Sequence, residues 1–148
     1  MVSFLVLVPS FDGSQAIEYQ VSDSVADTLG GIRFDNEIGQ MYSEEVLELA
    51  SKFIWETFQQ GEGGVREDIQ EITMVVESHE NSVVYTIFND IHLSAEYVSG
   101  YSGDVRIEVI GVIYHEATHV WQWGRGSGSG TPSGLIEGIA DYVRLKSG

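Results

Sequence analysis

Two histidines and a glutamate in the second half of the chain have the types and the spacing of a hydrolytic metal site. His115 and His119 form an HExxH arrangement, with Glu116 beside the first histidine. Residues four apart lie on one face of a helix, so both imidazoles could reach one metal ion. Glu116 projects to the flank, which suits a base acting on water better than a further ligand to the same metal. The motif therefore predicts metal-assisted hydrolysis.

The sequence around this motif favours a buried helix. No proline and no charge other than Glu116 falls between residues 109 and 123, and apolar residues flank the motif on both sides. Ser102 or Asp104 could cap this helix, whose N-terminus then lies near Val105. The other interpretation is a core helix with two hydrogen-bonded histidines and no metal. It is disfavoured because two imidazoles and a carboxylate are costly to bury without a function.

A further ligand can be sought downstream, where residues 134–146 have the pattern of a second helix. Glu137 is the best-placed carboxylate in this segment. Two histidines and a glutamate, with water in the fourth position, make a catalytic rather than a structural zinc site. Asp141 follows on the same helical face and could accept the free ring N–H of a ligating histidine as a supporting contact. The alternative for Glu137 is a solvated acid favoured by the helix dipole.

The run from Gly30 to Gly148 resembles the plant basic secretory proteins, also called the peptidases of plants and bacteria. The likeness is carried by the stretches GGIRFDNEIG, FIWETF, IHLSAEYVSGYSGDV, GVIYHEATHVWQW and GLIEGIADYVRLKSG. The resemblance implies a secreted, zinc-dependent metallopeptidase with a zincin fold, associated in plants with defence. It also implies that His115, His119 and Glu137 are the zinc ligands and that Glu116 is the catalytic base.

The chain departs from the family pattern in two respects. Family members run on beyond the point that matches Gly148, so we expect a C-terminal segment to be missing here. The family is named for its basic character, whereas this chain carries seven Lys and Arg against 23 Asp and Glu. Peptidases with this ligand set commonly use a Tyr or His to hold the oxyanion. The candidates for that support are Tyr114 and Tyr142.

A missing C-terminal segment would leave apolar surface exposed on the predicted helix over residues 134–146. Such a surface could drive self-association or binding of a partner. The apolar residues of this helix are Leu135, Ile136, Ile139, Val143 and Leu145.

Composition indicates one small domain. With 148 residues, 43% of them hydrophobic, the chain can bury a modest core, and without cysteine it folds without disulfides. A formal net charge of −16 argues against nucleic acid or an anionic membrane as partner, since both need basic patches. No stretch approaches the roughly 20 apolar residues that a membrane helix needs. The expected partner is a peptide or protein substrate.

The first sixteen residues differ from the rest of the chain. A short apolar run, VSFLVLV, is followed by small residues that suit cleavage after Ala16, which indicates an incomplete signal peptide and a secreted protein. The alternative is an N-terminal strand, because the same run is rich in good strand formers.

The expected fold is α+β and zincin-like, with a single metallopeptidase domain over residues 17–148. A small, mostly antiparallel sheet packs on a long N-terminal helix over residues 35–60, on the HExxH helix and on the following ligand-bearing helix. Strands are expected over residues 69–77 and 82–88, joined by a turn at 78–81. A short strand follows them. By resemblance to zincins it is the edge strand that pairs with substrate, and its residues are Ile91, His92, Leu93, Ser94 and Ala95.

Two functions from different classes follow from these observations. The first is a zinc metallopeptidase in which Glu116 is the general base for water attack on a peptide bond. The second is a truncated, catalytically inactive defence or binding protein in which zinc only stabilises the fold.

Overall fold

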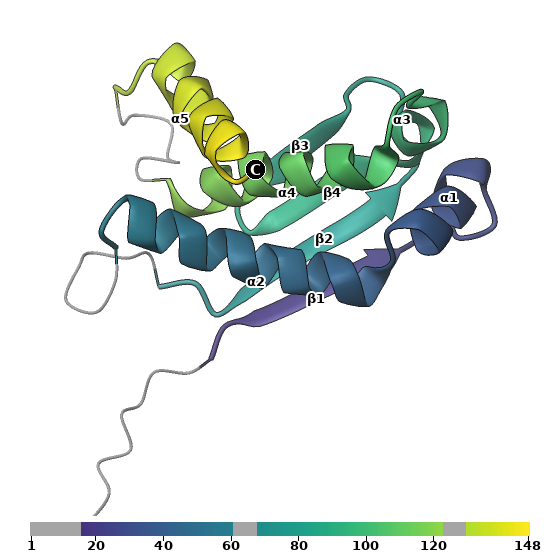
Figure 1. Ribbon diagram of the computed structural model, residues 1–148, viewed down its shortest axis with the longest axis horizontal. Helices are drawn as coiled ribbons and strands as arrows, with labels where there is room; N and C mark the ends of the chain where they lie inside the picture. The colour runs from purple at the N-terminus through teal and green to yellow at the C-terminus, as the bar shows by residue number, and fades with distance from the viewer. Residues whose placement is uncertain (1–15, 61–67, 123–129) are drawn as a thin grey trace, which may run out of the picture.

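The computed structural model describes residues 16–60, 68–122 and 130–148 (Figure 1). The predicted leader lies outside these residues except for Ala16. The helices and strands, in chain order, are β1 (Glu18–Asp23), α1 (Leu29–Glu37), α2 (Gln40–Thr57), β2 (Glu71–Glu77), β3 (Val84–Ile87), β4 (Asp90–Ser94), α3 (Ala95–Gly100), α4 (Val105–Trp121) and α5 (Ser133–Lys146).

The sheet is mixed, and the prediction of a mostly antiparallel sheet is wrong. Its strand order is β1-β2-β4-β3, with β2 parallel to both β1 and β4, and only β3 antiparallel to its neighbour. The predicted hairpin between β2 and β3 does not form, because β4 lies between them. Ile91 and Leu93 of β4 are fully buried, so this strand takes a central place, whereas every residue of β3 is at least partly exposed.

The position of β3 also corrects the predicted substrate strand. Residues 91–95 do not form an edge, since β4 is paired on both sides and Ala95 already begins α3. The edge beside α4 is β3, which turns into β4 through Phe88 and Asn89. Phe88 adopts a positive φ of 54° at this tight turn, a conformation that a residue with a bulky side chain rarely adopts.

Helices α2 and α4 lie across one face of the sheet, and α5 packs on α4 (Figure 1). Alternate residues of β2, namely Ile72, Met74 and Val76, are buried in the core, as the two-residue period of a strand with one covered face requires. Trp121 of α4 is also buried and donates from Nε1 to Ser51 Oγ of α2 at 3.0 Å. The two helices are therefore fixed to each other by apolar packing and by a buried hydrogen bond.

The predicted helix over residues 35–60 is divided into α1 and α2. The break is at Gly39, whose φ of 86° and ψ of 154° lie outside the helical region and are easily adopted only by glycine. Helix α1 begins earlier than predicted because Thr28 caps it, its side chain accepting from the Gly31 amide. Gly30 allows α1 to approach α3, since a Cβ there would lie 2.0 Å from the Ala95 carbonyl oxygen.

The two helices that carry the HExxH motif and the downstream acids agree closely with prediction. Helix α4 begins at Val105, and the Asp104 carboxylate accepts from the Ile107 amide at 3.1 Å as its N-cap. Helix α5 covers the predicted segment but completely buries only Ala140 and Val143. The short helix α3 precedes α4 and ends at Gly100.

The apolar residues predicted to be exposed on α5 divide into two groups. Leu135 and Leu145 are 55% and 80% exposed, whereas Val143 is buried, and Ile136 and Ile139 are half-buried between these two groups. Self-association through this surface stays a prediction. In the described part of the chain, no helix has the length and apolar character to cross a membrane.

Candidate metal centre

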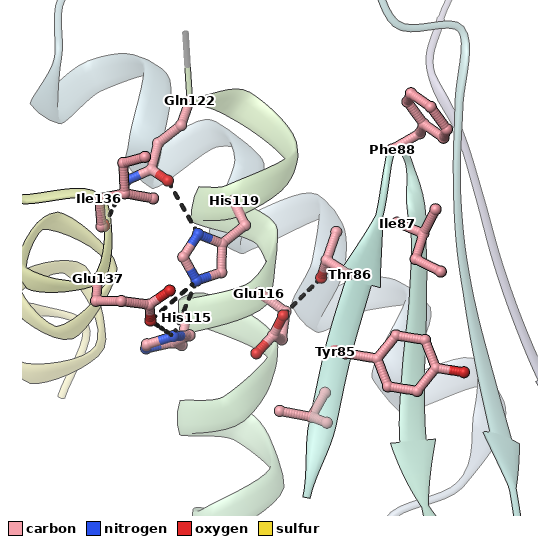
Figure 2. Close-up of a pocket in the computed structure, with 11 residues that line it drawn as sticks. Tyr85, Thr86, Ile87, Phe88, His115, Glu116, His119, Gln122, Ile136 and Glu137 are labelled. Atoms are coloured by element: carbon pink, nitrogen blue, oxygen red, sulfur yellow. Dashed lines mark hydrogen bonds and ion pairs between the residues drawn. The ribbon is translucent and has the colours of Figure 1, made fainter. Parts of the chain in front are cut away.

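A cleft of about 680 Å³ lies between α4, α5 and the edge strand β3 (Figure 2). It has polar groups on the helical side and mostly apolar groups on the strand side. The residues that line it are Val84, Tyr85, Thr86, Ile87, Phe88, His115, Glu116, His119, Gln122, Ile136 and Glu137. A concave site with a few convergent polar groups is the usual form of a small-molecule or substrate site.

Three side-chain atoms converge on the helical side of this cleft. The Nε2 atoms of His115 and His119 lie 3.1 Å apart, as the four-residue spacing on α4 allows. Glu137 of α5 brings its Oε2 to 3.3 Å from the first of these nitrogens and to 3.4 Å from the second. Figure 2 shows the Glu137 carboxylate directed toward both rings from the neighbouring helix.

The outer ring nitrogen of each histidine faces an acceptor. His115 Nδ1 lies 3.1 Å from Asp141 Oδ1, and His119 Nδ1 lies 2.9 Å from Gln122 Oε1. The Gln122 amide has its oxygen toward the ring because its nitrogen donates to the Ile136 carbonyl at 2.8 Å. Both Nδ1 atoms therefore carry hydrogen, and in neutral imidazoles this leaves both Nε2 atoms with lone pairs.

Three electron-pair donors thus meet within 3.4 Å of one another. Without a shared proton or cation such an arrangement is repulsive, whereas a cation between the three atoms would be attracted by all of them. Ring nitrogens oriented by an outer acceptor are also the usual form of metal-ligating histidines. His115, His119 and Glu137 could therefore hold a metal ion.

Glu116 lies beside this group but faces the other way. A carboxylate oxygen of Glu116 is within 4.8 Å of the two imidazole ligand atoms, so this residue could also reach a metal. Its side chain nevertheless extends from α4 toward β3, where Thr86 Oγ1 donates to Glu116 Oε2 at 2.6 Å (Figure 2). Glu116 is only 4% exposed. A buried carboxylate held at the flank of the imidazole pair is placed to take up a proton rather than to complete the ligand set.

An ion pair outside the cleft lining joins α5 to α4. Arg144 Nη2 donates to Glu108 Oε2 at 2.8 Å, and Tyr97 donates to Glu108 Oε1 at 2.7 Å. Burial alone would raise the pKa of Glu108, but the hydrogen bonds from Tyr97 and Arg144 outweigh it and lower that pKa. Burial and the same glutamate raise the pKa of Tyr97 to about 12. Arg144 can lie across α4 because Gly111 has no side chain, and a Cβ there would lie 2.9 Å from Arg144 Nε.

Neither tyrosine proposed to hold the oxyanion is among the described residues that line the cleft. Tyr114 is turned toward α2, where its ring packs edge-on against Phe53 at 5.9 Å, and burial raises the pKa of its hydroxyl. Tyr142 is 48% exposed and lies under the Lys146 ammonium, 5.8 Å from the ring centroid. Tyr114 is next to His115 in the sequence. Its side chain nevertheless lies on the face of α4 that packs against α2 and not on the face that lines the cleft.

His92 is also remote from the imidazole pair. Its Nδ1 contacts Glu77 Oε1 at 2.9 Å, and its ring stacks on Tyr85 at 4.5 Å. The period of the strand places both rings on the side of the sheet away from α4, where Figure 2 shows the Tyr85 side chain. His92 therefore has a structural partner and lies outside the lining of the candidate site.

Sequence reasoning missed two residues of the site, Gln122 and Thr86. The role of Gln122 could have been predicted from the sequence, because it follows His119 by three positions and an amide there can reach the ring of that histidine. No local sequence pattern indicates the role of Thr86. Its contact with Glu116 depends on β3 being the strand beside α4, which follows from the sheet order rather than from any local pattern.

Comparison with known proteins gives one match. The family model described as a peptidase of plants and bacteria matches residues 14–148, which is nearly the whole chain. No curated protein and no solved structure matches the chain.

Proposed function

Since the chain belongs to the family of peptidases of plants and bacteria, we propose that it is a zinc-dependent metallopeptidase whose centre is the cleft between α4, α5 and β3. The observation that carries this proposal is the convergence of His115 Nε2, His119 Nε2 and Glu137 Oε2 from two helices. A buried carboxylate, Glu116, lies next to them. A peptidase needs a group that activates a carbonyl and a base for water, and these residues could supply both.

The donor set fits zinc. Tetrahedral zinc with bonds of about 2.0–2.1 Å separates its ligand atoms by roughly 3.3 Å. The three distances between the donor atoms are 3.1, 3.3 and 3.4 Å. Two imidazoles and one carboxylate are also the ligands of a catalytic rather than a structural zinc site, because they leave a position open. We therefore propose His115, His119 and Glu137 as ligands, with Asp141 and Gln122 orienting the two rings.

Zinc, when bound, supplies a Lewis acid that makes water more acidic and a peptide carbonyl more electrophilic. The residues of the chain do the rest. The Glu116 carboxylate accepts a proton from the attacking water and then delivers it to the nitrogen of the leaving amine. Its burial between α4 and β3 limits its access to bulk solvent, so the proton is transferred locally.

The substrate we propose is a peptide in extended conformation, paired with the outer edge of β3, beside which no other strand lies in the described part of the chain. The Ser94 amide donates to the Val83 carbonyl, so residues 83, 85 and 87 direct their backbone groups toward β4. In an antiparallel ladder the alternate residues, Val84 and Thr86, then direct theirs to the unpaired edge. This edge lines the cleft, and main-chain pairing would hold a peptide beside Glu116 with little demand on its sequence.

The experiment that tests this function combines metal analysis with a cleavage assay. Purified protein is assayed for bound metals by elemental analysis and incubated with a mixed peptide library, with and without a chelator. One zinc per chain and cleavage that the chelator abolishes and zinc restores would support the proposal. Zinc without cleavage would favour the inactive, zinc-stabilised protein, and a protein that binds no zinc would overturn both.

The resemblance to plant secretory proteins also supports secretion and a part in defence. Both stay proposals, because the residues of the predicted leader other than Ala16 lie outside the described part of the chain. Expression of the full chain in plant cells, followed by N-terminal sequencing of the protein in the medium, tests the first. A mature N-terminus at Ile17 is the expected result, whereas retention of the uncut chain inside the cells contradicts it.

A further inference from the structure

We propose that Thr86 is a positioning residue for the base, and that it links the orientation of Glu116 to the pairing of substrate with β3. The inference rests on the proposed function, because it gives Glu116 a catalytic role and β3 a substrate. It goes beyond that function in naming a residue outside the HExxH motif that sets the geometry of the base.

The first observation is the contact itself. Thr86 Oγ1 donates to Glu116 Oε2 at 2.6 Å, from a half-buried residue to one that is 4% exposed. A hydrogen bond to a carboxylate in such surroundings is stronger than one in water, and it restricts rotation of the carboxylate group. With Oε2 occupied by the hydroxyl, Oε1 is the oxygen left to accept a proton from water in the cleft.

The second observation is that the side chain and the backbone of Thr86 face two different parts of the cleft. Its side chain points to α4 and contacts the base (Figure 2). Its backbone N–H and C=O point to the free edge, as the alternation from Val83 along β3 requires. A peptide that pairs with this edge would hydrogen-bond the main chain of the same residue that holds Glu116. One residue would thus set the distance between the substrate backbone and the base.

A merely structural threonine would satisfy a buried carboxylate and nothing more. The two roles differ in what the hydroxyl changes. If Thr86 only supports the fold, removal of its hydroxyl lowers the stability of the protein. It then changes kcat and KM no more than removal of a threonine hydroxyl elsewhere on the sheet. If it positions the base, its loss lowers kcat while zinc affinity and KM change little, because neither the ligands nor the substrate edge is altered.

The test compares three variants of the zinc-loaded protein. Thr86→Val removes the hydroxyl at nearly constant shape, and Thr86→Ser keeps it. Thr73→Val is the matched control, since Thr73 Oγ1 also donates to a carboxylate, Asp90 Oδ1 at 2.7 Å, at an exposed position on the same sheet. We expect Thr86→Val to lower kcat about ten-fold or more, with KM and zinc affinity within about two-fold of wild type, and Thr86→Ser to restore most of the activity.

A second measurement reads the hydrogen bond without metal or substrate. The side-chain carboxyl carbon of Glu116 is observed by NMR in glutamate-labelled, metal-free protein and assigned by its loss in Glu116→Gln. Its resonance should move in Thr86→Val and stay in place in Thr73→Val and Thr86→Ser. Thermal melting of each variant shows that it is folded.

The outcomes separate this inference from the function on which it rests. A wild-type protein that binds no zinc and cleaves no peptide removes the proposed function and the positioning role with it. A wild-type protein that cleaves, with Thr86→Val as active as Thr73→Val, overturns the positioning role alone. The same holds if Thr86→Ser is as impaired as Thr86→Val, or if the Glu116 resonance does not respond.

Discussion

Arg144 of α5 reaches across Gly111 and donates to Glu108 of α4 at 2.8 Å. The pair joins the helix that carries both histidines to the helix that carries Glu137. It lies away from the proposed zinc ligands, yet it helps to set the spacing between them. A contact outside the cleft lining thus holds together the two helices that supply the candidate ligands.

Glu116→Gln should abolish hydrolysis and leave zinc bound. Glutamine has the same shape but accepts no proton at neutral pH, and Glu116 is not among the proposed ligands. The measurement is kcat/KM on any peptide that the wild type cleaves, together with zinc content. Retained hydrolysis by a clean sample of this variant would falsify the assignment of the base.

Gln122→Leu should weaken zinc binding by about 10- to 100-fold, because the acceptor that orients the His119 ring is lost. Zinc affinity is measured by competition with a chromophoric chelator. Gln20→Leu is the control, since the Gln20 side chain donates to exposed Glu18 on β1, away from the cleft. Equal affinities in the two variants would show that Gln122 has no part in holding the ring.

Arg144→Met should loosen α5 and lower zinc affinity although no ligand changes. Loss of the Glu108 contact is expected to cost about 1 kcal/mol, a modest value because the Arg144 side chain is 37% exposed and screened by solvent. Arg106→Met is the control, because Arg106 lies on α4, as Glu108 does, but stacks over the ring of Tyr42 of α2. The measurements are the free energy of unfolding and the zinc affinity of both variants.

Glu108 should make the metal-free fold sensitive to acid. Its pKa in the fold is lowered from the ordinary value of 4.5, so its contribution to stability is full above that value and is lost as pH falls through the folded pKa. The advantage of wild type over Glu108→Gln in free energy of unfolding should thus shrink on acidification below about 4.5. A difference that is constant from pH 7 to pH 3 would contradict the lowered pKa.

Substrate pairing with β3 predicts sensitivity to backbone methylation. N-methylation of a peptide amide next to the scissile bond removes one main-chain donor and should lower kcat/KM by about two- to ten-fold, the effect of one hydrogen bond. The control peptide has the same methyl group at its terminus. Equal rates for a series of methylated positions would argue against pairing along this edge.

Local patterns were sufficient for the helices that carry the centre. The apolar run, the Asp104 cap and the HExxH spacing predicted α4, and the downstream pattern predicted α5 with Glu137 on it. The approach of Glu137 and Asp141 to His115 was also expected, since one helical turn separates the two acids. Short-range periodicity and capping decide these features, so a single sequence contains them.

The sheet could not be predicted in the same way. The order of strands in a sheet depends on contacts between residues far apart in the chain. Here β2 pairs with β4, although β3 lies between them in the sequence. The turn-like segment at residues 78–81 suggested that β2 and β3 pair as a hairpin. Local composition does not show that the chain passes beyond the place of β4 and forms the edge of the sheet. The contact of Thr86 with Glu116 joins residues far apart in the chain and depends on that order. Gly39 likewise separates α1 from α2 through a backbone angle that glycine permits but does not require.

Helix α5 buries few side chains, so a bound metal ion would also stabilise its packing on α4. This helix completely buries only Ala140 and Val143, so a zinc ion shared by its Glu137 and the histidines of α4 would act as a cross-link between the helices. At a free zinc concentration one hundred times the dissociation constant, binding would stabilise the folded chain by about 2.7 kcal/mol. The lifetime of the protein in the presence of proteases would then rise and fall with the zinc supply around it.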